Sequence, residues 1–449
     1  MKNSAFTHHL GALVRRSALL ASLVAAITIT ACGGGGDSGG TGAGDSLASA
    51  STDTGFSQGA ITGFGSIIVN GVRIDDSKAR ISDDDDDDTP GRGRDDLRLG
   101  MVVSVTTGTG TATATASVIS FASELQGPVQ SINGVTSSAS TTSSISSTSS
   151  TSSTTSTTPT SGSGTATVTA TTQTLVILGQ TVIVGTRTIF DPESLPRGFT
   201  DIRVGNVLEV HGFLDAASNK LTATRIERKN NANKYKITGN VASLNAGSKT
   251  FKIGSENITY ANIDPDKLRA NLANGITVKV RLATTPAATD TWSATRIKSA
   301  NNFVNRNKME LEGLITAFTN VGSFSVNGIP VDASRATMPA SNGALAVGVR
   351  VEVKGSMVDG KLIATKVKVE GRENDNDEDR GIELHGTISN VSTASKTFSL
   401  RGLTVSYAGA VDFQRGTAAS LVNGAQVEVK GEAATGGTTV QARKIKFED

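Results

Sequence analysis

Hydrophobic and polar residues alternate in short runs along most of this 449-residue chain. The runs VLEV at 207–210, VEV at 351–353 and VEV at 427–429 are clear examples, and each places every second side chain on one face. A period of two is typical of a β-strand with one face buried. The pattern therefore predicts an all-β protein built from short strands.

The same succession of runs returns five times, which indicates tandem repeats. Each repeat opens on an alternating strand that contains a glycine, at Gly63, Gly127, Gly239, Gly313 and Gly386. A glycine inside a strand is typical of the bend that curls a small sheet. In two repeats an Asn-Gly pair follows, at 70–71 and 327–328, and favours a tight hairpin turn.

Each repeat has three strands, a short helical segment and two more strands, with residues 266–272 and 418–421 as examples of the helical segment. This is the order of elements in an OB-type barrel, a five-stranded and partly open Greek-key barrel. We therefore expect about five small OB-like barrels in tandem. A β-sandwich and a continuous β-solenoid fit the same alternation and stay alternatives. The expected repeats are residues 57–123, 124–230, 235–300, 308–372 and 382–449.

Three segments have too few apolar side chains to form a core. Residues 32–56 are rich in glycine and serine and are expected to be a flexible tether. Residues 136–172 are nearly all serine and threonine, and predict a disordered insertion between the first two strands of the second repeat. The insertion could have no function, because lengthening a surface loop costs little entropy. The alternative is that it is a glycosylated, extended loop. Residues 373–381 form an acidic linker.

The first 31 residues have the features of a secretory signal peptide, with a basic start and an apolar run too short to span a membrane. The segment leads into ITAC at 29–32, which resembles the lipobox of bacterial lipoproteins, and Cys32 is the only cysteine. The resemblance implies a lipid on the Cys32 thiol, acyl chains such as palmitate, and a membrane anchor. Gly33 favours the outer membrane by resemblance to the enterobacterial sorting rule. A plain signal peptide followed by a free thiol is the alternative.

Three motifs carry a further resemblance: ITGFGSIIVNG at 61–71, LRLG at 97–100 and LAVG at 345–348. Together with closing strands of the form LxATxI, they resemble a bacterial family known as domain of unknown function 5666. Its members are small β domains, often in tandem, in secreted or lipid-anchored proteins. Because the family has no established activity, the resemblance implies a fold and a compartment, and no catalytic residues.

Charge and histidine content argue against several classes of function. Without the three basic residues of the signal segment, 40 basic and 41 acidic residues remain, which argues against a dedicated nucleic-acid binder. Beyond that segment the only histidines are His211 and His385, which occupy different places in their repeats. No nucleophile or metalloprotease motif accompanies them. We therefore expect no enzyme, and structural or surface roles for both histidines.

Two acidic clusters offer oxygen ligands. Asp83–Asp88 is a run of six aspartates, and Asp375, Asp377 and Asp379 alternate with other residues. Alternating carboxylates suit Ca²⁺, although Arg380 stands where an EF-hand requires its glycine. The sequence thus predicts weak Ca²⁺ binding at the alternating aspartates, and solvated, mutually repelling loops are the alternative.

Basic residues recur at the same positions of the closing strands. They are Arg225, Arg296, Lys366 and Lys444, with Lys298, Lys368 and Lys446 two residues further on. Residues two apart share a face, so these side chains are expected to point outward and could bind an anionic polymer. The scarcity of aromatic residues, 4% of the chain, favours a polysaccharide over a nucleic acid. The alternative is that the lysines protect an edge strand from pairing with another chain.

These features predict a non-enzymatic cell-envelope lipoprotein with a structural, adhesive or ligand-binding role. Its partners would be the membrane, through the lipid, and an envelope or extracellular polysaccharide or protein, with no nucleic acid. Binding of an anionic polysaccharide through the basic residues is one alternative, and service as an accessory subunit of an envelope enzyme is another. No cofactor is expected beyond weakly bound Ca²⁺.

Overall fold

The computed structural model describes residues 55–83, 92–108, 114–134, 173–300, 305–338, 345–370, 381–434 and 436–448. These ranges contain β-strands, turns and four 3₁₀ helices of three or four residues. No helix within them is long and apolar enough to cross a membrane. The all-β fold predicted from the alternating sequence is therefore confirmed.

The strands fall into five successive groups, called repeats 1 to 5 below. Repeat 1 contains β1 (Gly55–Phe64), β2 (Ile67–Val69), β3 (Val72–Asp75), β4 (Arg80–Asp83), η1 (Arg94–Asp96), β5 (Val102–Thr107) and β6 (Ala114–Phe121). Repeat 2 contains β7 (Leu125–Gly134), β8 (Gln173–Ile177), β9 (Gln180–Val184), β10 (Ile189–Phe190), η2 (Gly198–Asp201), β11 (Val207–Asp215) and β12 (Lys220–Arg228). Repeat 3 contains β13 (Tyr235–Asn240), β14 (Ala242–Asn245), β15 (Thr250–Ile253), β16 (Glu256–Thr259), η3 (Pro265–Lys267), β17 (Leu268–Arg269), β18 (Thr277–Leu282) and β19 (Thr291–Ser299).

The last two groups repeat the same arrangement. Repeat 4 contains β20 (Arg306–Asn320), β21 (Ser323–Val326), β22 (Ile329–Asp332), β23 (Arg350–Val358) and β24 (Lys361–Val369). Repeat 5 contains β25 (Ile382–Thr387), β26 (Ser389–Ser392), β27 (Thr397–Leu400), β28 (Leu403–Ser406), β29 (Asp412–Gln414), η4 (Ala418–Ser420), β30 (Gln426–Ala433) and β31 (Thr439–Phe447).

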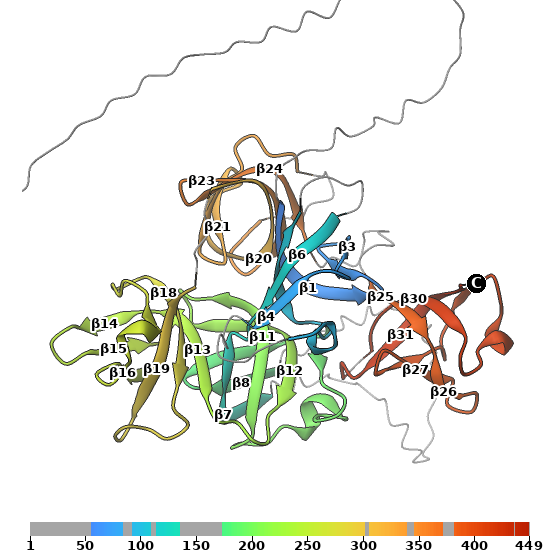
Figure 1. Ribbon diagram of the computed structural model, residues 1–449, viewed down its shortest axis with the longest axis horizontal. Coiled ribbons are helices and arrows are strands. Elements are labelled where there is room, and N and C mark those ends of the chain that lie inside the picture. The colour runs from blue at the N-terminus through green and yellow to red at the C-terminus, as the bar shows by residue number, and fades with distance from the viewer. Residues whose placement is uncertain are drawn as a thin grey trace, which may run out of the picture. The chain divides into compact units, whose positions relative to one another are not determined.

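Repeat 4 shows how each group closes into a barrel (Figure 1). Its first strand β20 pairs antiparallel with β21, and β21 pairs antiparallel with β22. The chain then crosses over, because β22 pairs in parallel with the last strand β24. Strand β23 lies antiparallel between β24 and β20 and completes the ring. In order of position the strands run 1-2-3-5-4 and return to 1, which is the circuit of an OB-type barrel.

The same circuit recurs in the other groups, with β1, β7, β13 and β25 as first strands. In repeats 3 and 5 the first strand is interrupted and continues as β14 and β26, respectively. The prediction of OB-like barrels is thus confirmed. The sandwich and solenoid alternatives are wrong, because the fourth strand of each group pairs back to the first.

A glycine before the fourth strand helps to close each barrel. In repeat 3 the Gly275 amide donates to the carbonyl of Val241 at 2.8 Å, and the Val241 amide donates to the Ile276 carbonyl at 2.9 Å. The four equivalent glycines make the same contact with the first strand at 2.8 to 2.9 Å. All five have φ between +81° and +95°, a range that favours glycine. These glycines are Gly100, Gly205, Gly275, Gly348 and Gly424.

The hairpin turns predicted from Asn-Gly are confirmed. Asn70 and Gly71 have φ of 55° and 71°, and Asn327 and Gly328 have φ of 50° and 78°, as a type I′ turn requires. The helical segments are shorter than predicted. Within 418–421 the 3₁₀ helix covers Ala418–Ser420, whereas at 266–272 the helix ends at Lys267 and strand β17 follows.

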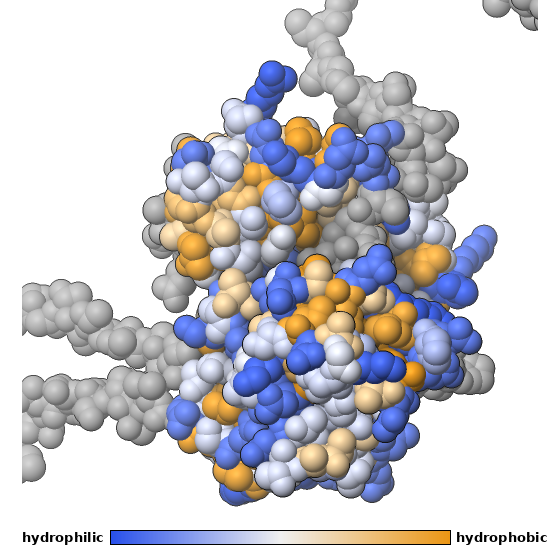
Figure 2. All heavy atoms as spheres, turned by 90° about the vertical axis from the view of Figure 1, so that its left-hand side faces the viewer, coloured by the Kyte–Doolittle hydropathy of each residue, from blue (hydrophilic) through white to orange (hydrophobic). Residues whose placement is uncertain are grey.

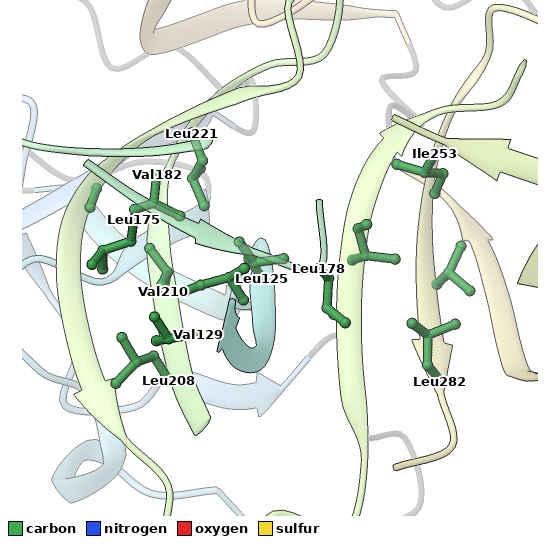
Figure 3. Packing of buried hydrophobic residues seen from close by; sticks show 14 of the residues in the cluster. Leu125, Val129, Leu175, Leu178, Val182, Leu208, Val210, Leu221, Ile253 and Leu282 are labelled. Atoms are coloured by element: carbon green, nitrogen blue, oxygen red, sulfur yellow. The ribbon is translucent and has the colours of Figure 1, made fainter. Parts of the chain in front are cut away.

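Alternate side chains of the strands fill the barrels with aliphatic residues. In repeats 2 and 3 these residues form one continuous cluster, because β7 pairs with β13 and joins the two barrels. Figure 3 shows Leu125 and Leu178 lying between the buried residues of repeat 2 and Ile253 and Leu282 of repeat 3. Because the inward side chains of β13 and β18 are packed in this core, the outward side chains of the two strands have fixed positions relative to one another.

Candidate binding faces on the outer side of the barrels

The first, fourth and fifth strands of each barrel are neighbours, and their outward side chains form rows across the three strands. In repeat 3 the pairing of β13 with β18, and of β18 with β19, gives two such rows. One row is Lys236, Arg281 and Arg296, and the next is Thr238, Lys279 and Lys298. We call these six residues the basic face of repeat 3.

The equivalent rows of the other repeats carry different charges. In repeat 2 the pairings give Gln126, Glu209 and Glu227 as one row, and His211 and Arg225 in the next. In repeat 4 they are Glu310, Lys354 and Lys366, then Glu312, Glu352 and Lys368. In repeat 5 they are Glu383, Lys430 and Lys444, then His385, Glu428 and Lys446. Repeat 3 therefore differs from these repeats in having five cations and no carboxylate in its rows.

Groups of repeat 2, and of the segment that joins it to repeat 1, contact the basic face. The Lys236 ammonium lies 2.9 Å from the Ser123 hydroxyl and 3.3 Å from Oε1 of Glu209. The Lys279 ammonium lies 3.3 Å from Oε1 of Glu124. The same face forms a depression that Ser123, Lys236, Thr238, Lys279, Arg281, Arg296 and Lys298 line together with two apolar residues. Five cations thus converge on a hollow that is bordered by two carboxylates.

The surface around the barrels is mixed in character. Figure 2 shows one face of the molecule, on which hydrophilic side chains in blue are interspersed with smaller groups of hydrophobic ones in orange. In the described ranges the exposed large aliphatic residues come from separate parts of the chain: Val204, Val321, Val347, Val358, Ile363 and Val422. These apolar residues do not come from one segment, so the faces of the barrels are compared below by their charged residues.

The recurrent basic residues of the closing strands differ in how far they are exposed to solvent. Arg225 and Arg296 are buried, with 2% and 3% of their surface exposed, whereas Lys366 is exposed and Lys444 is half-buried. The Arg225 guanidinium lies 2.6 Å from Oδ1 of Asp191. The edge-strand alternative is wrong, because each closing strand pairs with the fourth strand on one side and the third on the other.

In repeat 2 the outward row is a network of ion pairs. Glu209 lies 2.7 Å from the Lys229 ammonium and 3.3 Å from that of Lys236. Burial opposes ionisation of Glu209, but the charges of Lys236, His211 and Lys229 outweigh it and hold the pKa of Glu209 well below its usual range. His211 is buried, and its Nδ1 lies 3.2 Å from the carbonyl of Ala122, which fits the structural role expected from the sequence.

In repeat 4 two carboxylates share one lysine. The Lys354 ammonium lies 2.6 Å from Oε1 of Glu310 and 3.1 Å from Oε1 of Glu352. Burial and the hydrogen bond with Glu352 raise the pKa of Glu310 to about 7, although Lys354 opposes the shift. This face therefore changes its charge near neutral pH.

In repeat 5 a histidine lies among carboxylates. His385 Nε2 is 2.8 Å from Oε1 of Glu383, and Nδ1 is 3.0 Å from Oε1 of Glu448. The hydrogen bond with Glu383 is the main cause that raises the pKa of His385, and burial opposes it. The same hydrogen bond, together with Lys430, lowers the pKa of Glu383 to about 2 despite its burial. Glu428 lies opposite His385 across β25 and β30.

Several predicted sites lie outside the described residues: Cys32, the aspartates from Asp84 to Asp88, and Asp375, Asp377 and Asp379. The serine- and threonine-rich insertion lies there as well, as does the predicted tether up to residue 54. The last two residues of that tether, Gly55 and Phe56, belong to strand β1. Sequence reasoning found the closing-strand residues of the faces and missed their partners on the first and fourth strands. The alternation on the fourth strand already indicated that Lys279 and Arg281 point outward, since they flank an inward valine. It could not show which residues lie beside them, because the rows depend on pairing between distant strands.

Comparison with known proteins finds a family model that matches three segments of the chain. The model of the family "Domain of unknown function (DUF5666)" matches residues 163–227, 312–368 and 385–446, which fall in repeats 2, 4 and 5. Three successive segments of the chain thus match one family model, which is consistent with tandem copies of this domain. Repeats 1 and 3 have the same circuit of strands as the three DUF5666 segments.

Two further comparisons complete these findings. No curated protein matches the sequence. Among solved structures, Drosophila Unr CSD456 is similar at 12% sequence identity with a TM-score of 0.13, covering 49% of this chain and 98% of that one.

Proposed function

We propose that this DUF5666 protein is a non-enzymatic, lipid-anchored protein of the cell envelope that binds an anionic polysaccharide through the basic face of repeat 3. One observation supports the binding: Lys279 is paired directly with Lys298 across β18 and β19, and Arg281 with Arg296. These two pairs hold four cations side by side on neighbouring strands. Such a concentration of positive charge attracts sulfate or carboxylate groups.

A polysaccharide fits this face better than a single-stranded nucleic acid. Proteins that bind single strands stack the bases on exposed aromatic rings. In repeat 3 the aromatic rings belong to the core side: Phe251 is buried, and Tyr235 and Trp292 pack edge to face at 5.6 Å against the hydrophobic cluster. Cations alone suffice for charged sugars, because their sulfate and carboxylate groups are bound as point charges.

Binding of dextran sulfate to the full chain in detergent tests the proposal. We expect saturable binding that weakens steeply with salt and is absent with neutral dextran. The double variant Lys279→Ser/Lys298→Ser should bind at least tenfold more weakly. The matched control Lys366→Ser/Lys368→Ser, on the exposed side of repeat 4, should change the affinity less than twofold. An equal loss in both variants, or tighter binding of oligothymidine than of dextran sulfate, would overturn the proposal.

The anchor rests on the sequence ITAC at 29–32, with Cys32 as the lipidated residue. Two or more acyl chains are needed for stable attachment to a bilayer, and a triacylated cysteine meets that need. Cells that produce the protein should incorporate labelled palmitate into it, and the Cys32→Ala variant should not. Label retained in the variant would refute the anchor. Protease treatment of intact cells then distinguishes an outward-facing protein, which is digested, from one that faces the periplasm.

A further inference from the structure

We propose that Glu383, His385 and Glu428 of repeat 5 bind a divalent transition-metal ion such as Zn²⁺. One ligand atom from each of these three side chains lies within 4.8 Å of the other two. One imidazole and two carboxylates are a ligand set that Zn²⁺ accepts, with water at the fourth position. Neither the polysaccharide site in repeat 3 nor the predicted Ca²⁺ site uses these residues.

The strands hold the three ligands in place. Glu383 and His385 are two residues apart on β25, on the same side, and Glu428 lies directly opposite His385 on β30. The intervening Leu384 and the neighbouring Val429 are fully buried and fix both strands against the core. The ligand positions are therefore set by backbone pairing, which lowers the entropic cost of assembling a site.

The orientation of His385 matches that of a metal ligand. Its Nδ1 lies 3.0 Å from Oε1 of Glu448, the residue that follows β31. Histidines that bind metals usually donate the N–H of their other ring nitrogen to a carboxylate, which fixes the ring and its tautomer. This contact leaves Nε2, 2.8 Å from Oε1 of Glu383, as the nitrogen that faces the carboxylate ligands. Glu448 thus acts as a positioning residue for His385.

Cations already occupy this cluster, and the metal must displace them. The Lys430 ammonium lies 3.3 Å from Oε2 of Glu383, and the Lys446 ammonium lies 3.1 Å from Oε2 of Glu428. Arg73 from β3 contacts Glu383 and faces His385 Nε2. Three cations thus surround the two carboxylates. Protonation of His385, favoured by Glu383 and Glu448, also competes with a metal, so binding strengthens as pH rises.

The ligand set selects among metals. Ca²⁺ takes six to eight oxygen ligands, and Mg²⁺ retains several waters in an octahedral shell, so neither gains from an imidazole. Imidazole nitrogen suits Zn²⁺, Cu²⁺ and Ni²⁺. We therefore expect Zn²⁺ to bind at concentrations at which Ca²⁺ and Mg²⁺ do not.

Calorimetric titration of the full chain with ZnCl₂ tests this site, with protein purified without a polyhistidine tag. We expect saturable binding that is at least tenfold tighter at pH 8 than at pH 6. His385→Gln should weaken binding at least tenfold, as should Glu428→Gln. The matched control is Glu352→Gln, which changes the position equivalent to Glu428 in repeat 4 and should leave the affinity unchanged.

Two further measurements distinguish loss of the Zn²⁺ site from unfolding of the variant. Thermal unfolding of each variant without metal shows whether the barrel still folds, and the Zn²⁺-dependent rise in melting temperature should vanish only in the repeat 5 variants. The NMR signal of the His385 ring should shift on addition of Zn²⁺. Absence of saturable binding, equal affinity in His385→Gln, or equally tight binding of Ca²⁺ would each overturn the proposal.

Discussion

Lys279 and Lys298 are paired directly across β18 and β19, at the position where repeat 5 has Glu428 opposite Lys446. In repeat 5 the two side chains form an ion pair, with the Lys446 ammonium 3.1 Å from Oε2 of Glu428. The two barrels share one fold and one register, so the fold does not require the like-charged pair. Repeat 3 therefore carries a second cation at the position where repeat 5 carries a carboxylate.

Reversing one charge in each pair should have opposite effects on stability. Lys298→Glu places a carboxylate opposite Lys279 and should raise the free energy of unfolding by about 0.2–1 kcal/mol. Lys446→Glu places two carboxylates opposite each other and should lower it by a similar amount. Denaturant titration measures both, and the first variant should also lose affinity for dextran sulfate. A stability loss in Lys298→Glu with affinity intact would contradict this account.

Much of the fold could be predicted from local pattern. Alternation gave the strands, and the Asn-Gly pair at 327–328 gave a hairpin turn that needs positive φ at both residues. A glycine equivalent to Gly348 precedes the fourth strand in every repeat, because the barrel closes there through a positive φ. These features depend on one or two neighbouring residues, so the sequence displays them directly.

The candidate faces were only partly predictable, because they depend on contacts between distant segments. Arg225 and Lys366 occupy the same position in their repeats, yet the first is buried and the second is exposed. Arg225 contacts Asp191, which lies 34 positions earlier in the chain, and the carbonyl of Leu99 in repeat 1. The cluster around His385 likewise assembles from three strands, and alternation on one strand does not reveal it.

The glycine that closes each barrel should be sensitive to substitution. Gly275 has φ of 88°, and a Cβ there would meet no atom within 4 Å. The cost of Gly275→Ala is therefore one of backbone conformation alone, about 1–2 kcal/mol of unfolding free energy. Gly247→Ala, in an exposed turn, is the matched control. Equal stabilities of the two variants would show that closure does not need this conformation.

The buried Arg225 of repeat 2 should contribute more to stability than Lys366, its exposed counterpart in repeat 4. Arg225→Met leaves the Asp191 carboxylate without its 2.6 Å partner in a largely buried place. Removing one member of such a pair costs about 3 kcal/mol or more. Lys366→Met, at the same position of repeat 4, should change stability by less than about 0.5 kcal/mol. Thermal and denaturant unfolding distinguish them, and a comparable loss in both would refute the importance of the ion pair.

Repeat 4 should lose stability as pH rises through neutrality. The pKa of Glu310 is about 7 in the folded protein, mainly because the side chain is buried and hydrogen-bonded with Glu352. Its usual value is 4.5, so the folded state holds a proton that the unfolded state releases first. The stability that this proton gives is complete below pH 4.5 and is lost as pH approaches and passes 7.

Glu310→Gln removes this titration while keeping a side chain that can hydrogen-bond. At pH 8 the variant should be more stable than the parent by on the order of 1–3 kcal/mol, and at pH 4.5 the two should be nearly equal. Denaturant titrations across this range measure the difference. Glu432→Gln, whose carboxylate is exposed beside Arg443, is the control and should follow the parent at every pH. A Glu310→Gln profile parallel to that of the parent would show that Glu310 stays ionised in the barrel.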